Sequence, residues 1–356
     1  MQAMQNCSTS AMRRRRIRVL VVDDSALMRQ MLQSILDSDS GIEVVGTAPD
    51  PLSARQMIKD LNPDVITLDV EMPKMDGLAF LEKIMALRPM PVIMVSSLTK
   101  RGADTTLRAL ESGAVDFVTK PKGVARDGFA DFKAELIPKV KAAVSARVTA
   151  SGQTRPQKSP PRAIRRRVGV NLIAIGASAG GVVAIQTVLS ALPSTCPGVL
   201  ITQHMPPAYT NSFAARLNQN CLLTVVEASD GERIQAGHAY IAPGGYHLEA
   251  IRDRQGGFKC RVYDGPLVSG HCPSVDVLFQ SVAKQAGAQA IGVILTGMGR
   301  DGAKGLLAMR EAGAATLGQN QASCVVYGMP RAAMEIGAVA AESALENIGK
   351  EICSVS

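Results

Sequence analysis

Short apolar runs alternate with helical stretches between residues 17 and 146. Five runs have the length and the β-branched composition of buried strands: IRVLVVDD, EVVGTA, DVITLD, PVIMVSS and VDFVTK. The segments between them carry apolar residues at helical spacing, as in residues 25–36 with Leu27, Met28, Met31, Leu32 and Ile35. Strands that alternate with helices predict a parallel sheet with helices on both faces.

A second α/β pattern follows further along the chain. Strand-like runs return at LIAIG, VLITQH, AYIAP and IGVILTG, separated by helix-like segments such as residues 275–285. Residues 227–260 are richer in glycine and in alternating positions, so we expect hairpins there, one of them over AYIAPGGY between His238 and His247. The pattern predicts a second parallel-sheet domain of Rossmann-like α/β type with a hairpin insertion.

Length and charge fit two domains joined by a basic linker. A chain of 356 residues is too long for one ordinary core. The formal charge of +8 is concentrated in residues 1–16 and 147–168, and the second segment also contains Pro, Ser and Gly. We therefore expect a disordered basic tail over 1–16, a first domain over 17–146, a linker over 147–168 and a second domain over 169–356.

The folded parts are mildly acidic once those two basic segments are set aside. Aromatic residues make up 3% of the chain and Trp is absent, which argues against a stacking surface for nucleic acid. The seven cysteines show no metal-finger spacing, so a reducing cytoplasm is the expected location. We expect no partnership with nucleic acid.

One uncharged segment is long enough to cross a bilayer. It extends from residue 168 to 215 and contains Leu172–Leu192. Its centre is the glycine-rich GASAGG, and the apolar positions after it fall on one helical face. The segment is therefore predicted as a buried strand, a turn and an amphipathic helix, and not as a membrane span.

Polar and charged residues, three of them aspartates, stand at the ends of the predicted strands of the first domain. Asp23 and Asp24 end the first strand, Asp69 the third, Ser96 the fourth and Lys120 the fifth. The carboxyl ends of parallel strands share one edge, where ligands gather. Three carboxylates at one place repel unless a cation offsets them, and Mg²⁺ is the natural hard cation. A single Asp at a strand end is more often a loop residue, so the prediction depends on the whole set.

The motifs VVDDSALMR, TLDVEMPKMDG, MVSSLT and FVTKP appear in the order and spacing of response-regulator receiver domains, and the chain resembles them over about residues 17–140. The resemblance implies a flavodoxin-like (βα)₅ fold. It also implies that the domain binds Mg²⁺ and needs the ion for its phosphorylation. It also implies the roles of six residues: Asp69 as the phosphorylated aspartate, Asp23 and Asp24 as metal ligands with Asp69, Ser96 as the switch hydroxyl, Lys120 as the phosphate-sensing lysine, and Phe117 as the aromatic switch.

The turn GASAGG raises the question of a nucleotide site or a nucleophile. The dinucleotide motif needs glycine where Ser178 stands and an acidic residue about twenty positions later, but no Asp or Glu occurs in residues 136–226. The turn does satisfy Gly-x-Ser-x-Gly, which holds a serine hydroxyl in the open between a strand and a helix. By itself this motif is weak, since a serine in a tight turn is usually structural.

A serine nucleophile needs a base and an orienting acid. His204 ends a predicted strand, and Asp301 follows another one beside Gly297 and Gly299, whose neighbouring amides could form an oxyanion hole. His271 lies in a predicted loop and could line the pocket. His238 and His247 are more simply structural. The chain order Ser, His, Asp differs from that of the α/β-hydrolases, where the acid precedes the histidine.

The motifs GASAGG, TQHMPPAYT, YIAPGGYHL, GHCPSVDVLF, LTGMGRDGAKG and VVYGMPRAA together resemble the catalytic domain of the chemotaxis protein-glutamate methylesterases over about residues 171–340. The resemblance implies Ser178 as nucleophile, His204 as general base, Asp301 as orienting acid and Met298 near the oxyanion site, with no cofactor in this domain. It further implies a cytoplasmic, phosphorylation-activated esterase that acts on glutamate methyl esters, and on glutamines, of methyl-accepting chemotaxis receptors. A chemotaxis histidine kinase is the implied phosphodonor, and contact with the membrane is expected only through the receptors.

Two alternatives belong to other functional classes. A transcription factor would carry a basic output domain, but residues 168–356 hold twelve Lys and Arg against thirteen Asp and Glu. A scaffold with a vestigial triad, in which phosphorylation controls only docking, stays open at the level of sequence.

Overall fold

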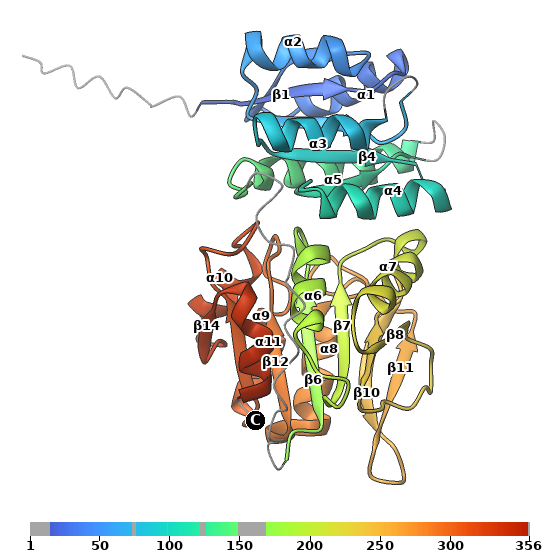
Figure 1. Cartoon of the computed structure of the whole chain (residues 1–356), viewed down its shortest axis with the longest axis vertical. Helices are drawn as coiled ribbons and strands as arrows, with labels where there is room; N and C mark the ends of the chain where they lie inside the picture. The colour runs from blue at the N-terminus through green and yellow to red at the C-terminus, as the bar shows by residue number, and fades with distance from the viewer. Residues whose placement is uncertain (1–14, 73–75, 98, 122–125, 149–168, 355–356) are drawn as a thin grey trace, which may run out of the picture.

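The computed structural model describes residues 15–72, 76–97, 99–121, 126–148 and 169–354. Two α/β units follow one another along the long axis of the molecule (Figure 1). The predicted basic tail up to residue 14 and the predicted linker from residue 149 lie outside the described residues.

The N-terminal unit is a five-stranded sheet with the strand order β2-β1-β3-β4-β5. All its strand pairs are parallel, so the carboxyl ends share one edge. The five predicted strands are all present. The elements are β1 (Ile17–Val22), α1 (Ala26–Asp37), β2 (Ile42–Ala48), α2 (Pro51–Leu61), β3 (Val65–Asp69), α3 (Gly77–Leu87), β4 (Val92–Ser96), α4 (Lys100–Glu111), β5 (Asp116–Thr119) and α5 (Arg126–Ala143).

Local sequence explains where several of these helices begin. The side chains of Ser25, Asp50, Asp76 and Thr99 each accept a hydrogen bond from a backbone N–H in the first turn of the helix that follows. Such caps satisfy N–H groups that have no partner within the helix. Strands β3 and β4 are buried along their whole length, which explains why their sequences are continuous apolar runs rather than alternating ones.

The C-terminal unit is a seven-stranded sheet with the order β14-β13-β12-β6-β7-β9-β8, parallel at every pair, and a separate antiparallel ribbon of β10 and β11. The elements are β6 (Leu172–Ala177), α6 (Gly181–Ser190), β7 (Gly198–Gln203), α7 (Pro207–Asn220), β8 (Thr224–Glu227), β9 (His238–Ile241), β10 (His247–Arg252), β11 (Phe258–Tyr263), α8 (Val275–Ala286), the 3₁₀ turn η1 (Gly287–Gln289), β12 (Ala290–Ile294), α9 (Ala303–Glu311), β13 (Ala315–Gln319), α10 (Met329–Glu335), β14 (Ala341–Ser343) and α11 (Leu345–Ser354).

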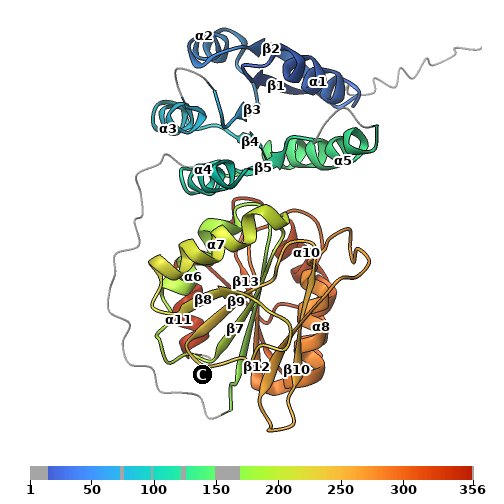
Figure 2. The same cartoon turned by 90° about the vertical axis from the view of Figure 1, so that its right-hand side faces the viewer.

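Helices cover both faces of this sheet (Figure 2). Helices α6, α7 and α11 pack on one face, while α8, α9, α10 and the β10–β11 ribbon pack on the other. The parallel order again gathers the carboxyl ends of the strands at a single edge, and in both views this edge faces the N-terminal unit. The predicted fold class is confirmed in both units.

The predicted hairpin over AYIAPGGY is wrong. Residues 238–241 form β9, which lies inside the parallel sheet and pairs with β7 on one side and β8 on the other. Both edges of β9 are thus occupied, and β10 has no place beside it. The turn at Pro243–Tyr246 instead leads the chain out of the sheet, and the hairpin of this region is β10–β11.

The long uncharged segment forms the predicted strand, turn and helix as β6 and α6. Among the helices of the described residues, none is both long and apolar enough to cross a bilayer.

Candidate functional site

Ser178 lies in a tight turn between β6 and α6. Its backbone N–H donates to Thr296 O at 3.0 Å, and its carbonyl accepts from Gly181 N at 2.8 Å. Gly180 has φ +76°, and a methyl group on Gly297 would lie 2.8 Å from Cβ of Ser178. Glycine is required at both positions, at one for the left-handed backbone and at the other for the close approach. The turn presents a partly exposed serine at the carboxyl edge of the sheet.

His204 follows the neighbouring strand and lies beside this turn. Its backbone N–H donates to Ala177 O at 3.2 Å, and its ring Nε2 lies 2.8 Å from Oδ2 of Asp301. Within the described residues, the other ring nitrogen, Nδ1, is buried without a hydrogen-bond partner, and no hydrogen bond joins the Ser178 hydroxyl to the ring. Catalytic hydrogen bonds are often long before substrate binds. The imidazole and the carboxylate are therefore paired, and Nδ1 is the ring nitrogen that is free to accept a proton.

Asp301 is 2% exposed and lies between β12 and α9, at the N-terminus of α8. Its carboxylate accepts from Ser274 Oγ at 2.8 Å, from Val275 N at 2.7 Å and from Asp276 N at 3.1 Å. Burial works against the charged form, but the hydrogen bonds from His204, Val275 and Ser274 outweigh it and lower the pKa of Asp301. The acid is held as a carboxylate although it is buried.

His271 stacks on the catalytic candidate. The rings of His204 and His271 lie 3.6 Å apart between centroids, at 16° to each other. Burial is the main cause that lowers the pKa of His271 to about 4, and the neighbouring His204 and Lys139 lower it further. His271 is therefore a neutral wall of the site at physiological pH. His271 packs against the His204 ring and is not among the residues that line the pocket at the boundary of the two units.

The N-terminal unit covers the edge at Ser178. A pocket at the boundary is lined by Ser178, Gly180, Gly181, Val182, Val183, Gln203 and Met205 from one unit and by Leu110, Asp116 and Phe117 from the other. The ring of Phe117 lies 4.5 Å from that of Tyr209, and Arg216 forms a two-pronged ion pair with Glu111. Apolar residues of α5 form one cluster with Ala179, Val326 and the partly buried Met298. These contacts limit access to the serine turn.

A partly buried ammonium group lies at the same boundary. Lys139 donates to the carbonyl of Phe117 at 2.6 Å, pairs with Glu135 at 2.7 Å and lies 3.5 Å from Asp116. Burial opposes its charge, but the two carboxylates outweigh burial and raise the pKa of Lys139. Lys139 thereby holds the backbone of Phe117, one of the residues that contact the C-terminal unit.

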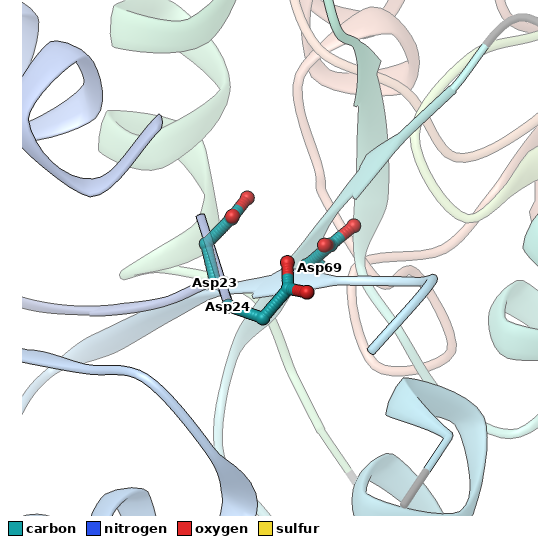
Figure 3. A group of neighbouring side chains, drawn as sticks. All are labelled: Asp23, Asp24 and Asp69. Carbon is teal, nitrogen blue, oxygen red and sulfur yellow. The ribbon is translucent and has the colours of Figure 1, made fainter. Parts of the chain in front are cut away.

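The predicted acidic pocket lies at the carboxyl edge of the first sheet (Figure 3). One oxygen from each of Asp23, Asp24 and Asp69 lies within 4.8 Å of the others. Lys120 Nζ lies 3.1 Å from Asp23 and 2.9 Å from Asp69. Burial is the main cause that raises the pKa of Asp69 to about 6, against the opposing effect of Lys120. Three clustered oxygen donors fit a hard divalent cation such as Mg²⁺.

Ser96 is near this pocket but its hydroxyl is bonded elsewhere. Thr106 of α4 donates to Ser96 Oγ at 2.7 Å, and both side chains are buried. Phe117 is buried on β5 and faces the C-terminal unit. Ser96 is thus bonded to α4, and Phe117 lies on β5. Both of these elements contact the second unit.

Comparison with known proteins agrees with this arrangement. Residues 173–352 match the family model of the CheB methylesterase, and residues 19–126 match that of the response regulator receiver domain. The chain belongs to the CheB methylesterase family. It is 56% identical over 339 residues, 95% of this chain and 96% of the relative, to the protein-glutamate methylesterase/protein-glutamine glutaminase of Escherichia coli K12. The protein of the same description from Salmonella typhimurium LT2 matches to the same extent.

A solved structure supports the fold of the C-terminal unit. The CheB methylesterase catalytic domain of Thermotoga maritima is 32% identical, with a TM-score of 0.51, and the match covers 52% of this chain and 99% of that one. The receiver-domain match implies Mg²⁺-dependent phosphorylation in general.

The sequence predicted Ser178, His204 and Asp301 at one edge of the sheet, and His271 in a loop that could line the pocket. In the structure the His204 ring meets Asp301 and stacks on His271, and the backbone N–H of His204 bonds to the residue before Ser178. Gln203 and Ser274 were not predicted. The buried amide of Gln203 donates to the carbonyls of Ser178 at 2.9 Å and His204 at 3.1 Å. The sequence did offer one signal for Gln203, since this residue stands at the end of a predicted strand directly before His204.

His238 and His247 lie outside this group. His247 is buried, and its Nε2 lies 2.9 Å from Pro266 O. His238 begins β9, with Nδ1 3.1 Å from Ala236 O.

Proposed function

We propose that the protein is a protein-glutamate methylesterase and protein-glutamine glutaminase whose activity is controlled by phosphorylation. The observation that carries the proposal is the His204–Asp301 pair at 2.8 Å beside the Ser178 turn. We assign Ser178 as the nucleophile, His204 as the general base and Asp301 as the orienting acid. The N–H of Met298, next to Gly297, is assigned to the oxyanion hole.

The reaction follows from these assignments. The Ser178 oxygen attacks the γ-carbonyl carbon of a glutamate methyl ester while Nδ1 of His204 takes the hydroxyl proton. The tetrahedral intermediate collapses, the bond to the methoxy group breaks, and the imidazolium returns the proton so that methanol leaves. Water then attacks the acyl-serine with His204 again as base, which releases glutamate and restores the serine. A glutamine side chain follows the same course with ammonia as the leaving group.

Phosphorylation of Asp69 is the proposed control. Asp23, Asp24 and Asp69 would hold Mg²⁺, which offsets the charge on the phosphoryl oxygens. Lys120 is assigned to pair with the phosphoryl group, and Ser96 to donate to it. The covered serine edge supports the idea that the unphosphorylated N-terminal unit blocks substrate and that phosphorylation weakens this docking.

The proposed division of the chain is a basic tail over 1–16, a receiver domain over 17–146, a linker over 147–168 and a catalytic domain over 169–356. The proposed location is the cytoplasm. The proposed substrates are methyl-accepting chemotaxis receptors, and the proposed phosphodonor is a chemotaxis histidine kinase. Contact with the membrane is proposed only through the receptors.

Methanol release from radiolabelled, methylated receptor membranes tests this function. Wild type should release methanol faster when a small-molecule phosphodonor and Mg²⁺ are present. Ser178→Ala should release none above background, and Asp69→Asn should keep only the unstimulated rate. Release by Ser178→Ala at the wild-type rate would refute the serine mechanism. No release by wild type under any condition would favour the scaffold with a vestigial triad.

A further inference from the structure

The carboxylate of Asp301 is bound by one short segment of chain at the start of α8. Ser274 Oγ donates to Oδ1 at 2.8 Å, and Asp276 N donates to the same oxygen at 3.1 Å. Val275 N donates to Oδ2 at 2.7 Å, the oxygen that also meets Nε2 of His204. Donors on both oxygens fix the plane of the carboxylate as well as its position.

The hydroxyl of Ser274 has a second contact, which is weaker. As the N-cap of α8 it lies 3.5 Å from Val277 N, at the limit of a hydrogen bond, compared with 2.8 Å from Asp301. Ser274 is fully buried, and its own N–H donates to Nδ1 of His247 at 3.3 Å. The geometry therefore favours Asp301 as the main partner of this hydroxyl.

The same segment also contacts the base. His271, three residues before Ser274, stacks on the His204 ring at 3.6 Å. One stretch of chain thus contacts both members of the acid–base pair, the acid through hydrogen bonds and the base through ring packing.

We propose that Ser274 is a positioning residue for the esterase reaction. Its hydroxyl holds the Asp301 carboxylate in the orientation that binds Nε2 of His204 and leaves Nδ1 facing the serine turn. This inference rests on the proposed function and adds a fourth side chain to it. Ser274 touches no reacting atom, so its effect should appear in turnover and not in substrate binding.

Two substitutions separate positioning from helix capping. Ser274→Ala removes both the hydroxyl and the cap, whereas Ser274→Gly removes the hydroxyl but keeps a residue that caps almost as well as serine. In the full chain with phosphodonor and Mg²⁺, both variants should lose kcat by on the order of 10- to 100-fold with KM unchanged, as expected for one hydrogen bond to a charged group. Both should also lose the low-field proton NMR signal of the His204–Asp301 hydrogen bond.

The matched control is Ser281→Ala in the same helix. Ser281 is a partly buried serine whose hydroxyl donates to Leu278 O at 2.7 Å and accepts from Ala250 N at 2.9 Å. This variant should keep the wild-type kcat and the NMR signal.

Each result decides the inference. A kcat of Ser274→Gly equal to wild type while Ser274→Ala is impaired would show that the hydroxyl acts only as a cap and would overturn the proposal. A wild-type kcat in both variants, or an intact NMR signal with a lowered kcat, would overturn it as well. Ser178→Ala is assayed beside these variants. If the serine mechanism itself is wrong, Ser178→Ala still releases methanol, and this result is distinct from any result with the Ser274 variants.

Discussion

In the proposed mechanism, the orientation of the His204 ring decides which of its nitrogens receives the serine proton. Asp301 binds Nε2, and Nδ1 is buried with no hydrogen-bond partner in the part of the chain that the structure describes. A ring with its proton on Nε2 donates to the carboxylate and has a lone pair on Nδ1. Leaving that buried nitrogen unpaired costs about 1–3 kcal/mol. A substrate-bound arrangement in which the Ser178 hydroxyl meets Nδ1 removes this cost.

Replacing Asp301 with Asn tests this account of the ring. The amide offers a hydrogen-bond donor where Nε2–H also donates, so the ring should turn or change tautomer and lose its lone pair toward the serine. We expect kcat to fall by about 10,000-fold, as such a change does in a serine hydrolase with this triad. Methanol release under saturating substrate measures it.

The control for Asp301→Asn is Asp253→Asn. Asp253 is a carboxylate that accepts from Gln255 N at 2.9 Å and Gly257 N at 2.7 Å, in the turn between β10 and β11. Its substitution should leave kcat unchanged. A fall of similar size in both variants would show that Asp301→Asn acts through folding and not through the ring.

His271 should make the protein less stable in acid. The pKa is lowered from 6.5 to about 4 in the folded chain, so between these values the unfolded chain binds more protons. Above pH 6.5 the titration of His271 therefore costs the folded chain nothing. As the pH falls from 6.5 toward 4, this titration lowers the free energy of unfolding by up to about 3 kcal/mol. Urea unfolding from pH 7 to pH 4.5 should show a steeper loss for wild type than for His271→Gln. Parallel curves would contradict the lowered pKa.

Single residues at strand ends could be predicted from sequence, whereas their supporting contacts could not. Ser178, His204 and Asp301 each follow an apolar run, and parallel strands bring such positions to one edge. The contact of Ser274 with Asp301 depends on where the N-terminus of α8 packs, and no local pattern encodes that distance. Gln203 was missed for the same reason, since one of its two partners is the carbonyl of Ser178 at the end of a neighbouring strand.

At the scale of elements, the central strands were predictable and the strands at the sides of the sheet were not. Strands β6, β7 and β12 are fully buried apolar runs. Strand β13 reads ATLGQ and β14 has three residues, so neither has a clear apolar signal. The error at AYIAPGGY has a related cause, because a strand followed by Pro-Gly-Gly has the same local signal whether it joins a hairpin or a parallel sheet.

Helix α4 lies between the acidic pocket and the second unit, and the hydroxyl of its Thr106 bonds to Ser96 Oγ at 2.7 Å. In the proposed switch, the Ser96 hydroxyl leaves this bond when it moves toward phosphorylated Asp69. Thr106→Val keeps the shape of the side chain but removes the bond to Ser96, worth about 1 kcal/mol, and also the bond of the same hydroxyl to Gly102 O at 2.6 Å within α4. We expect methanol release without phosphodonor to rise about fivefold.

Thr67→Val is the matched control for Thr106→Val. Thr67 is a fully buried threonine on β3, and its hydroxyl has no hydrogen-bond partner among the residues that the structure covers. The same change of atoms there breaks no contact with α4. An equal rise in both variants would assign the effect to general loosening of the N-terminal unit, and no rise in Thr106→Val would remove Thr106 from the switch.

At the scale of the whole molecule, the two units meet through contacts that differ in kind. Phe117 and Tyr209 form an aromatic pair, Ala179 belongs to one apolar cluster with residues of α5, and Arg216 pairs with Glu111. The aromatic and aliphatic contacts bury apolar side chains, whereas the side chains of Arg216 and Glu111 are 31% and 24% exposed. A boundary of this kind can open without unfolding either unit. The ion pair is therefore the place to change docking while the pocket stays intact.

Reversing the charge at position 216 should release the catalytic unit. Arg216→Glu places two carboxylates together in place of a two-pronged ion pair, and a loss of about 1 kcal/mol in docking raises the open fraction about fivefold. Methanol release without phosphodonor should rise by that factor, and the further stimulation by phosphodonor should shrink accordingly. Glu111→Arg combined with Arg216→Glu restores opposite charges and should return both values toward wild type. If the single reversal leaves the basal rate unchanged, or the double variant stays as active as the single one, this contact does not hold the units together and the covering of Ser178 depends on the apolar contacts alone.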